Sequence, residues 1–166
     1  MKRSAERNIP MGQITVKAAA ILNAHPADVY ATIADYEHGH PKIIPKEHLY
    51  DLQVEQGGYG AGTIIRFKVK ALGFEETAHQ QVSEPEPGHV LVEQDIDSPR
   101  NAKTTFTVTP VDEDQKAHVE IATTMDTSPG FKGLVERLLV PLIQPPVYRK
   151  ELQLLEEVAQ QRSTKP

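Results

Sequence analysis

The amino-acid sequence predicts a single α+β domain in which a curved, seven-stranded antiparallel sheet wraps around a long, kinked C-terminal helix. Two observations predict this fold. Between residues 48 and 126, apolar and polar residues alternate in segments that are separated by turn-forming residues. From Phe131 to Val158, apolar residues recur at spacings of three and four, as on one face of a helix. An antiparallel sheet with one apolar face needs a cover, and this helix supplies it.

The beginning of the chain is predicted to add one strand and one or two short helices. We expect residues 1–12 to form a disordered or extended tail and residues 13–162 to form the domain. The pattern of residues 14–22 indicates the first strand. Pro26 suits the first turn of a helix that ends near Tyr36. Beyond this helix, glycine and prolines leave room only for a helical turn or a loop before the next strand.

Six further strands are predicted to form an antiparallel meander, because short turns join them. They cover residues 48–56, 63–72, 74–83, 88–96, 102–110 and 116–126. Alternation separates an apolar face from a polar one, as where Phe67 lies between Arg66 and Lys68. In the segment 88–96, the valines predict that Val92 lies on the apolar face and Glu93 on the polar face.

The C-terminal helix is predicted to begin at Ser128 and Pro129, with the serine as its cap and the proline at its first helical position. Its apolar stripe, which includes Leu138 and Leu142, is expected to cover the sheet. Prolines within 141–146 interrupt the helical pattern. Since proline removes a helical hydrogen bond and clashes with the preceding turn, we expect a kink or a break there.

Composition and charge exclude several classes of function. The chain has 166 residues, of which 39% are hydrophobic and 25% charged, as expected of one folded domain. A net charge of −5 argues against a nucleic-acid-binding surface, which usually needs a basic patch. The absence of cysteine excludes disulfides and thiolate metal sites and fits a cytoplasmic protein. No apolar run approaches the length of a spanning helix, so stable membrane insertion is not expected.

Several segments occur in an order that is typical of one protein superfamily. They are DYEHGHPKIIP at 35–45, VEQGGYGAGT at 54–63 with the RFKVKALG that follows shortly after, VSEPEPGHVLVE at 82–93, FTVTPV at 106–111 and the final helix. On these segments, the chain resembles the START-like superfamily, also called SRPBCC, and within it the bacterial proteins described as polyketide cyclase/dehydrase-like. The resemblance implies a helix-grip fold, with a cavity between sheet and helix that usually receives a hydrophobic or aromatic molecule. Some relatives dehydrate and cyclise polyketides, whereas others bind sterols, lipids, hormones or quinones without chemistry.

Polar residues on the predicted apolar face are candidates for contacts with such a molecule. Glu76 either lies at the end of the sheet in water or is a cavity carboxyl with a raised pKa that is suited to acid–base work. His40 is either an exposed loop residue or a polar contact at one end of the cavity. The spacing of His40 from His38 and His48 fits no zinc signature, so no metal is predicted.

A dry core would avoid the amides and hydroxyls that fall on the apolar face, unless they lie at strand ends or bond to one another. A cavity with a few placed polar groups is the other interpretation, and apolar and aromatic side chains supply its wall. The predicted ligand-binding residues are Tyr36, His40, Phe67, Glu76, Gln80, Gln94, Thr104, Phe106, Thr123, Met125, Leu138 and Leu142.

The predicted function is therefore binding of a hydrophobic or aromatic small molecule, without a cofactor, by a monomer or a homodimer. One alternative is an enzyme of the polyketide cyclase or dehydratase type, in which Glu76 or His40 transfers protons. The other is a lipid or quinone carrier, which needs an exposed apolar lip, expected near Ile43, Ile44 and Leu49. The sequence leaves open whether any reaction is catalysed.

Overall fold

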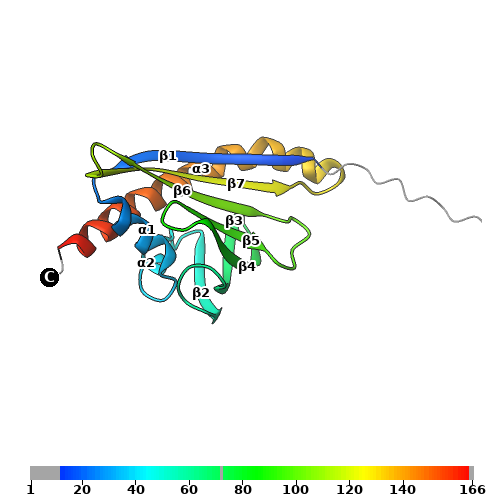
Figure 1. Cartoon of the computed structure of the whole chain (residues 1–166). Helices are drawn as coiled ribbons and strands as arrows, with labels where there is room; N and C mark the ends of the chain where they lie inside the picture. The colour runs from blue at the N-terminus through cyan, green and yellow to red at the C-terminus, as the bar shows by residue number, and fades with distance from the viewer. Residues whose placement is uncertain (1–11, 72, 165–166) are drawn as a thin grey trace, which may run out of the picture.

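The computed structural model describes residues 12–71 and 73–164. Its elements are β1 (Gln13–Leu22), α1 (Pro26–Ala34), α2 (His40–Ile43), β2 (Leu49–Gln56), β3 (Ile64–Ala71), β4 (Phe74–Glu86), β5 (Val90–Asp95), β6 (Lys103–Val111), β7 (Lys116–Asp126) and α3 (Gly130–Ser163). The strands form one antiparallel sheet in the order β1-β7-β6-β5-β4-β3-β2. The sheet curves around α3, and the short helices α1 and α2 lie near the C-terminal half of α3 (Figure 1).

The predicted α+β fold is confirmed, with seven antiparallel strands, short helices after the first strand and a long C-terminal helix. Strand β4 is longer than predicted, because it continues through Pro85 to Glu86. The register shifts between Ser83 and Glu86, and such an irregularity is where a strand tolerates proline. The predicted tail, residues 1–12, lies outside the described residues except for Gly12.

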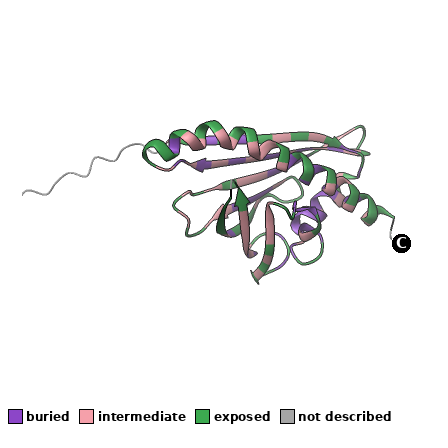
Figure 2. Ribbon diagram, turned by 180° about the vertical axis from the view of Figure 1, so that it is seen from behind, coloured by how far each residue is buried: buried purple, intermediate pink, exposed green. Residues whose placement is uncertain are grey.

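The hydrophobic core lies between the sheet and the C-terminal half of α3. Along β7, every second residue is buried, so Val119 and Ile121 point inward on the same face. Leu152 and Leu155 of α3 belong to the same buried cluster as Ile33 of α1. Figure 2 shows buried residues on the sheet and the short helices, whereas the outer side of α3 is exposed along much of its length.

Helix α3 is continuous through its prolines, so the predicted interruption is not a break. Its axis changes direction along its length, as Figure 2 shows. The predicted start is wrong by one residue, because Pro129 is the N-cap and no side chain caps the helix. Ser128 instead donates hydrogen bonds from its backbone N–H and its hydroxyl to the Glu136 carboxylate, each at 2.8 Å.

The first half of α3 presents a different face to the sheet from the one predicted. Leu138 and Leu142 were expected to cover the sheet, but they are 65% and 71% exposed. The rotation of the helix follows from Gly133, which is buried beside the preceding loop. A Cβ atom at Gly133 would lie 1.9 Å from the carbonyl oxygen of Ser128, so only glycine permits this approach.

The orientation of β5 also differs from the prediction, since Glu93 points inward and is 6% exposed. Residues that pair directly across an antiparallel ladder share a face. Glu93 pairs with buried Val82 of β4 and with Thr104 of β6, whose side chains face the concave side. Gln94 pairs with exposed Gln81 and therefore lies on the outer face.

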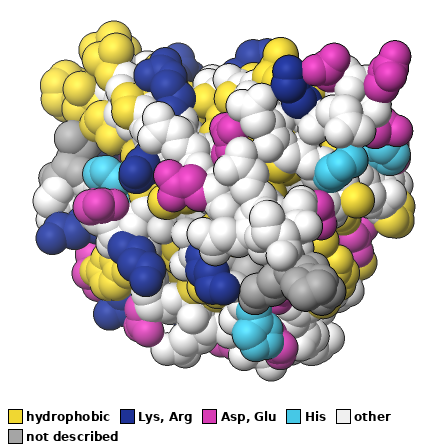
Figure 3. Space-filling view, turned by 90° about the vertical axis from the view of Figure 1, so that its left-hand side faces the viewer, with side chains coloured by type: hydrophobic (Ala, Val, Ile, Leu, Met, Phe, Trp, Pro, Cys, Tyr) yellow, Lys and Arg dark blue, Asp and Glu magenta, His cyan; other side chains and the backbone are white. Residues whose placement is uncertain are grey.

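An exposed apolar lip was expected near Ile43, Ile44 and Leu49, but Ile43 and Ile44 are only 0% and 8% exposed and Leu49 is half-buried. Exposed apolar residues occur elsewhere: Ile21, Tyr59, Phe74, Ile96, Phe131, Leu134, Leu138 and Leu142. On the face drawn in Figure 3, the largest group of hydrophobic side chains lies at one edge, and charged side chains of both signs are scattered over the rest. No helix of the described residues is long and apolar enough to cross a membrane.

Gly133→Ala is expected to destabilise the protein by about 1–3 kcal/mol, because its Cβ would overlap backbone that cannot move freely. The sign of the change in stability is diagnostic, since replacing glycine by alanine at an unconstrained helical position stabilises the folded protein by about 1 kcal/mol. Urea unfolding measures the change in free energy. Lys132→Ala, at the neighbouring exposed position, is the control and should change stability little. A stabilised G133A variant would show that Gly133 does not set the rotation of α3.

Candidate functional site

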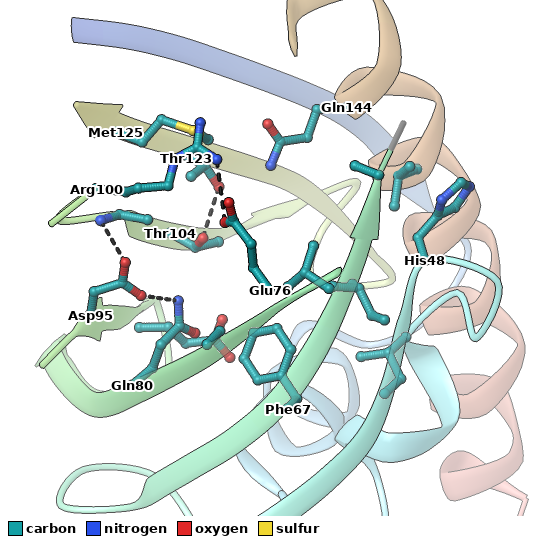
Figure 4. Close-up of a pocket in the computed structure, with 18 of the residues that line it drawn as sticks. His48, Phe67, Glu76, Gln80, Asp95, Arg100, Thr104, Thr123, Met125 and Gln144 are labelled. Atoms are coloured by element: carbon teal, nitrogen blue, oxygen red, sulfur yellow. Dashed lines mark hydrogen bonds and ion pairs between the residues drawn. The ribbon is translucent and has the colours of Figure 1, made fainter. Parts of the chain in front are cut away.

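A cavity of about 240 Å³ lies between the concave face of the sheet and α3. Strands β2 to β7 supply one side, and Val140, Ile143 and Val147 of α3 supply the other. Figure 4 shows Phe67, Met125 and the side chains around them converging on this space. The lining residues that stay exposed include several of the β3–β4 hairpin, so the cavity opens to solvent beside that hairpin.

The structure brings most of the predicted ligand-binding residues together around this cavity. Those that line it are His40, Phe67, Glu76, Gln80, Thr104, Phe106, Thr123 and Met125. They come from α2 and from four strands, and they share the cavity because the strands pair with their inward positions in register. Whether they contact a ligand stays a prediction.

The remaining predicted residues do not line the cavity. Gln94 lies on the outer face of the sheet, where its amide donates to Asn101 Oδ1 at 2.9 Å. Leu138 and Leu142 face away from the sheet. Tyr36 is fully buried behind the cavity wall, and its ring stacks on His40 with 4.5 Å between the ring centroids. Tyr36 therefore acts on the site only through its neighbours.

The deep end of the cavity is polar, and its central residue is Glu93, which was predicted to lie on the solvent-exposed face of the sheet. The Tyr36 hydroxyl donates a hydrogen bond of 2.6 Å to Glu93 Oε1. His40 Nε2 lies 3.5 Å from the same oxygen. His40 Nδ1 lies 2.7 Å from the carbonyl oxygen of Ile33, so Nδ1 carries a proton. The contact with Glu93 is then attractive only when a proton also lies on Nε2 or on the carboxyl.

Glu151 of α3 is a second carboxyl at this end, and it is 4% exposed. Within the part of the chain that the structure describes, its side chain makes no hydrogen bond and no ion pair. Burial raises the pKa of the Glu151 carboxyl well above its ordinary value, and the charge of nearby Glu93 raises it further. Glu151 therefore holds its proton and can donate it into the cavity.

Tyr148 completes the polar end. Its hydroxyl shares a hydrogen bond with Thr123 Oγ1 and accepts one of 2.9 Å from the Gln144 amide. Thr123 in turn bonds to Thr104 at 2.7 Å (Figure 4). Burial raises the pKa of Tyr148, so its phenol stays protonated. The predicted threonines are thus joined by hydrogen bonds to one another and to a helix residue.

The mouth of the cavity carries a second set of polar groups. Glu76 is exposed there, and its carboxylate lies 3.4 Å from a guanidinium nitrogen of Arg100 (Figure 4). This position agrees with the alternative that places Glu76 in water. Among the described residues, two buried side-chain atoms have no hydrogen-bond partner, namely Arg100 Nε and Gln80 Oε1. Both residues line the cavity, so the wall has unused hydrogen-bonding capacity.

Sequence reasoning missed Glu93, Arg100, Tyr148 and Glu151. For the two helix residues a signal existed, because Tyr148 belongs to the helical stripe that Leu152 and Leu155 continue, and Glu151 falls on the same face at spacings of three and four. A polar residue in such a stripe faces the interior. Glu93 gave no comparable signal, since apolar residues precede it on both faces of β5. No group of three or more metal-binding side chains occurs within residues 12–71 and 73–164.

Glu151→Gln is expected to make the stability of the protein less dependent on pH. Folded Glu151 keeps its proton at pH values where the unfolded chain has released it, so the free energy of unfolding falls as pH rises above the ordinary carboxyl pKa. The variant loses this fall, which is at most about 1.4 kcal/mol per pH unit for one proton. Urea unfolding at acidic and neutral pH measures it. Glu157→Gln, exposed on the same helix, is the control, and identical slopes in all proteins would contradict a neutral, buried Glu151.

Comparisons with known proteins agree with this architecture. Residues 13–160 match the family of polyketide cyclase / dehydrase and lipid transport proteins. Among curated proteins, none matches the chain. The solution structure of the KanY protein is 28% identical, covers 90% of this chain and 99% of its own, and has a TM-score of 0.77.

Two further solved structures share the fold at low identity. The Zhui aromatase/cyclase from Streptomyces sp. R1128 is 13% identical, with a TM-score of 0.74 and coverage of 92% of this chain and 96% of its own. A START superfamily protein from Mycobacterium smegmatis is also 13% identical, with a TM-score of 0.68 and coverage of 90% of this chain and 99% of its own. Because the family match spans nearly all described residues, the chain belongs to the polyketide cyclase / dehydrase and lipid transport family.

Proposed function

We propose that this protein binds a small hydrophobic or aromatic molecule that carries a hydrogen-bonding group at one end. The observation that carries the proposal is an apolar cavity whose buried end holds a hydrogen-bond donor, the protonated Glu151, and a hydrogen-bond acceptor, Glu93. Ligand sites combine apolar walls with a few placed polar groups in this way. Membership of a family that includes cyclases, dehydrases and lipid transport proteins supports it.

The size of the cavity limits the ligand. A closed apolar cavity of about 150 Å³ holds one benzene molecule. The cavity of about 240 Å³ therefore suits a molecule of one or two rings, or a short branched chain, with part of a larger ligand projecting through the mouth. The projecting part would meet Arg100, whose Nε has no partner among the described residues.

The polar end favours particular ligand groups. A hydroxyl can donate to Glu93 and accept from Glu151, and a carbonyl can accept from Glu151 or Tyr148. An anionic group is disfavoured there, because the charge of Glu93 already raises the pKa of its neighbour Glu151. We therefore expect neutral alcohols, phenols or ketones to bind with this end inward.

Val140→Trp is expected to abolish binding of naphthol, because the indole would fill the space that Val140 borders. Leu138→Trp is the matched control, since the same side chain on the exposed face of the same helix leaves the cavity unchanged. Fluorescence titration measures both affinities, and circular dichroism checks the fold. Naphthol should also bind wild-type protein about tenfold more tightly than naphthalene, because one hydrogen bond to the polar end is added.

Two results would contradict this proposal. One is equal affinity of the Val140→Trp and Leu138→Trp variants for naphthol. The other is a native mass spectrum and an organic extract that repeatedly contain no hydrophobic molecule, together with no binding of naphthol by the wild-type protein.

A second candidate function is proton-transfer catalysis of the cyclase or dehydratase type. In such a dehydration, a base removes a proton from the carbon beside a carbonyl, and an acid protonates the departing hydroxyl, so that water leaves. Glu93 is placed to accept the first proton, and buried Glu151 is placed to give the second. His40, 3.5 Å from Glu93, can accept that proton in turn. This pairing of donor and acceptor in one cavity is the specific observation that favours an enzyme.

If the protein is a dehydratase, it should convert a β-hydroxy ketone with a phenyl group into the conjugated enone, which absorbs in the near ultraviolet. Glu151→Gln should then lower the rate by about 10²–10⁴-fold, because the acid is lost while the shape is kept. Glu157→Gln is the control, since Glu157 is exposed on the same helix outside the cavity and should change the rate little. A rate no higher than that of buffer, or one that Glu151→Gln leaves unchanged, would rule out this role for Glu151.

A further inference from the structure

The first half of α3 bears a continuous row of exposed apolar side chains. Phe131 is 80% exposed, Leu134 56%, Leu138 65% and Leu142 71%. Their spacings of three and four residues place them on one side of the helix. We call these residues the α3 ridge. Exposed apolar rows of this kind mark contact surfaces more often than single exposed residues do.

The α3 ridge lies on the opposite side of the helix from the cavity. Val140, Ile143 and Val147 line the cavity, whereas Leu138 and Leu142 project into solvent. The core of the protein therefore does not use the ridge. Within the described residues no element covers it, because all its side chains are more than half exposed.

Cations surround the ridge. Lys132 and Arg137 are exposed and, at 3.6 residues per turn, lie on opposite flanks of it. Arg149 and Lys150 are exposed near its C-terminal end. The described residues offer none of these four an ion-pair partner.

The same stretch contains little negative charge. Glu136 is the one acidic residue between Gly130 and Lys150, and it already accepts hydrogen bonds from Ser128 and lies 3.4 Å from Arg100. A locally basic strip thus occurs on a chain whose net charge is −5. This distribution selects a partner that is both apolar and anionic.

We propose that the α3 ridge docks on an anionic lipid bilayer, with its apolar side chains in the boundary between headgroups and acyl chains. Lys132 and Arg137 would reach the lipid phosphates from both flanks, as long basic side chains do beside apolar helix faces. A second copy of the chain is a poorer partner, because ridge-to-ridge contact would bring like charges together. The proposal concerns a surface outside the cavity and does not depend on which ligand the cavity holds.

The experiment is co-sedimentation of the full chain with phosphatidylcholine vesicles that contain about 30% phosphatidylserine, compared with pure phosphatidylcholine vesicles. Binding to the anionic vesicles should be at least about tenfold stronger, and it should weaken in high salt because the lipid charge is then screened. Phe131→Ser with Leu138→Ser should reduce binding by about tenfold or more, and Lys132→Glu with Arg137→Glu should do the same.

Phe74→Ser is the matched control, because Phe74 is a phenylalanine of similar exposure, 75%, on a different element. It should leave vesicle binding unchanged. Thermal unfolding and naphthol binding show whether each variant keeps its fold and its cavity, and neither should change. No binding to anionic vesicles would overturn the proposal. So would full binding by the Phe131→Ser, Leu138→Ser variant, or a ridge variant that only converts a dimer into a monomer in analytical ultracentrifugation.

Discussion

The way α3 is fixed at its two ends determines which of its faces looks into the cavity. At the start, Gly133 packs closely against the Ser128 carbonyl oxygen. The Glu136 carboxylate accepts hydrogen bonds from the backbone N–H and the hydroxyl of Ser128. At the other end, Leu155 is fully buried and Arg162 lies 3.3 Å from Asp35. Between these points the helix must span the curved sheet without filling the concavity. The cavity is therefore a consequence of how the helix is attached.

The polar groups in the cavity persist because each has a physical compensation for its burial. Glu93 accepts a hydrogen bond from the Tyr36 hydroxyl, which lowers the cost of burying its carboxyl group. Glu151 has no such partner among the described residues and keeps its proton instead, as its raised pKa indicates. A carboxyl that keeps its proton beside a hydrogen-bonded second carboxyl is also an arrangement that acid–base chemistry uses.

The fold was predictable because its signals are local. Alternation, turn residues and the helical repeat each depend on neighbours in the sequence, and the strand from Lys116 to Asp126 shows the expected period along its whole length. The inward residues Phe67, Thr104 and Thr123 followed from that alternation. That these residues contact a ligand stays a prediction.

The errors arise where the sequence is apolar on both sides of an element. In β5, Val90, Leu91 and Val92 are consecutive, so alternation does not say which side faces inward. Pairing with β4 decides it and turns Glu93 inward. In the first half of α3, apolar residues occur on more than one face, so their periodicity does not select which face covers the sheet. The close approach of Gly133 to the Ser128 carbonyl oxygen selects the face, and such contacts are not visible in the sequence.

A kink or a break was predicted at the prolines of α3, and their surroundings explain why the helix continues through them. Pro141, Pro145 and Pro146 cannot donate to the carbonyls four residues earlier, which belong to Arg137, Pro141 and Leu142. Arg137, Pro141 and Leu142 are all exposed, so water can bond to the carbonyls that the prolines leave without a donor. Helices lengthen on the side where carbonyls turn to water, and they bend convex toward solvent. The prolines therefore favour a curved α3, and they lie in the part of the helix whose inner face lines the cavity.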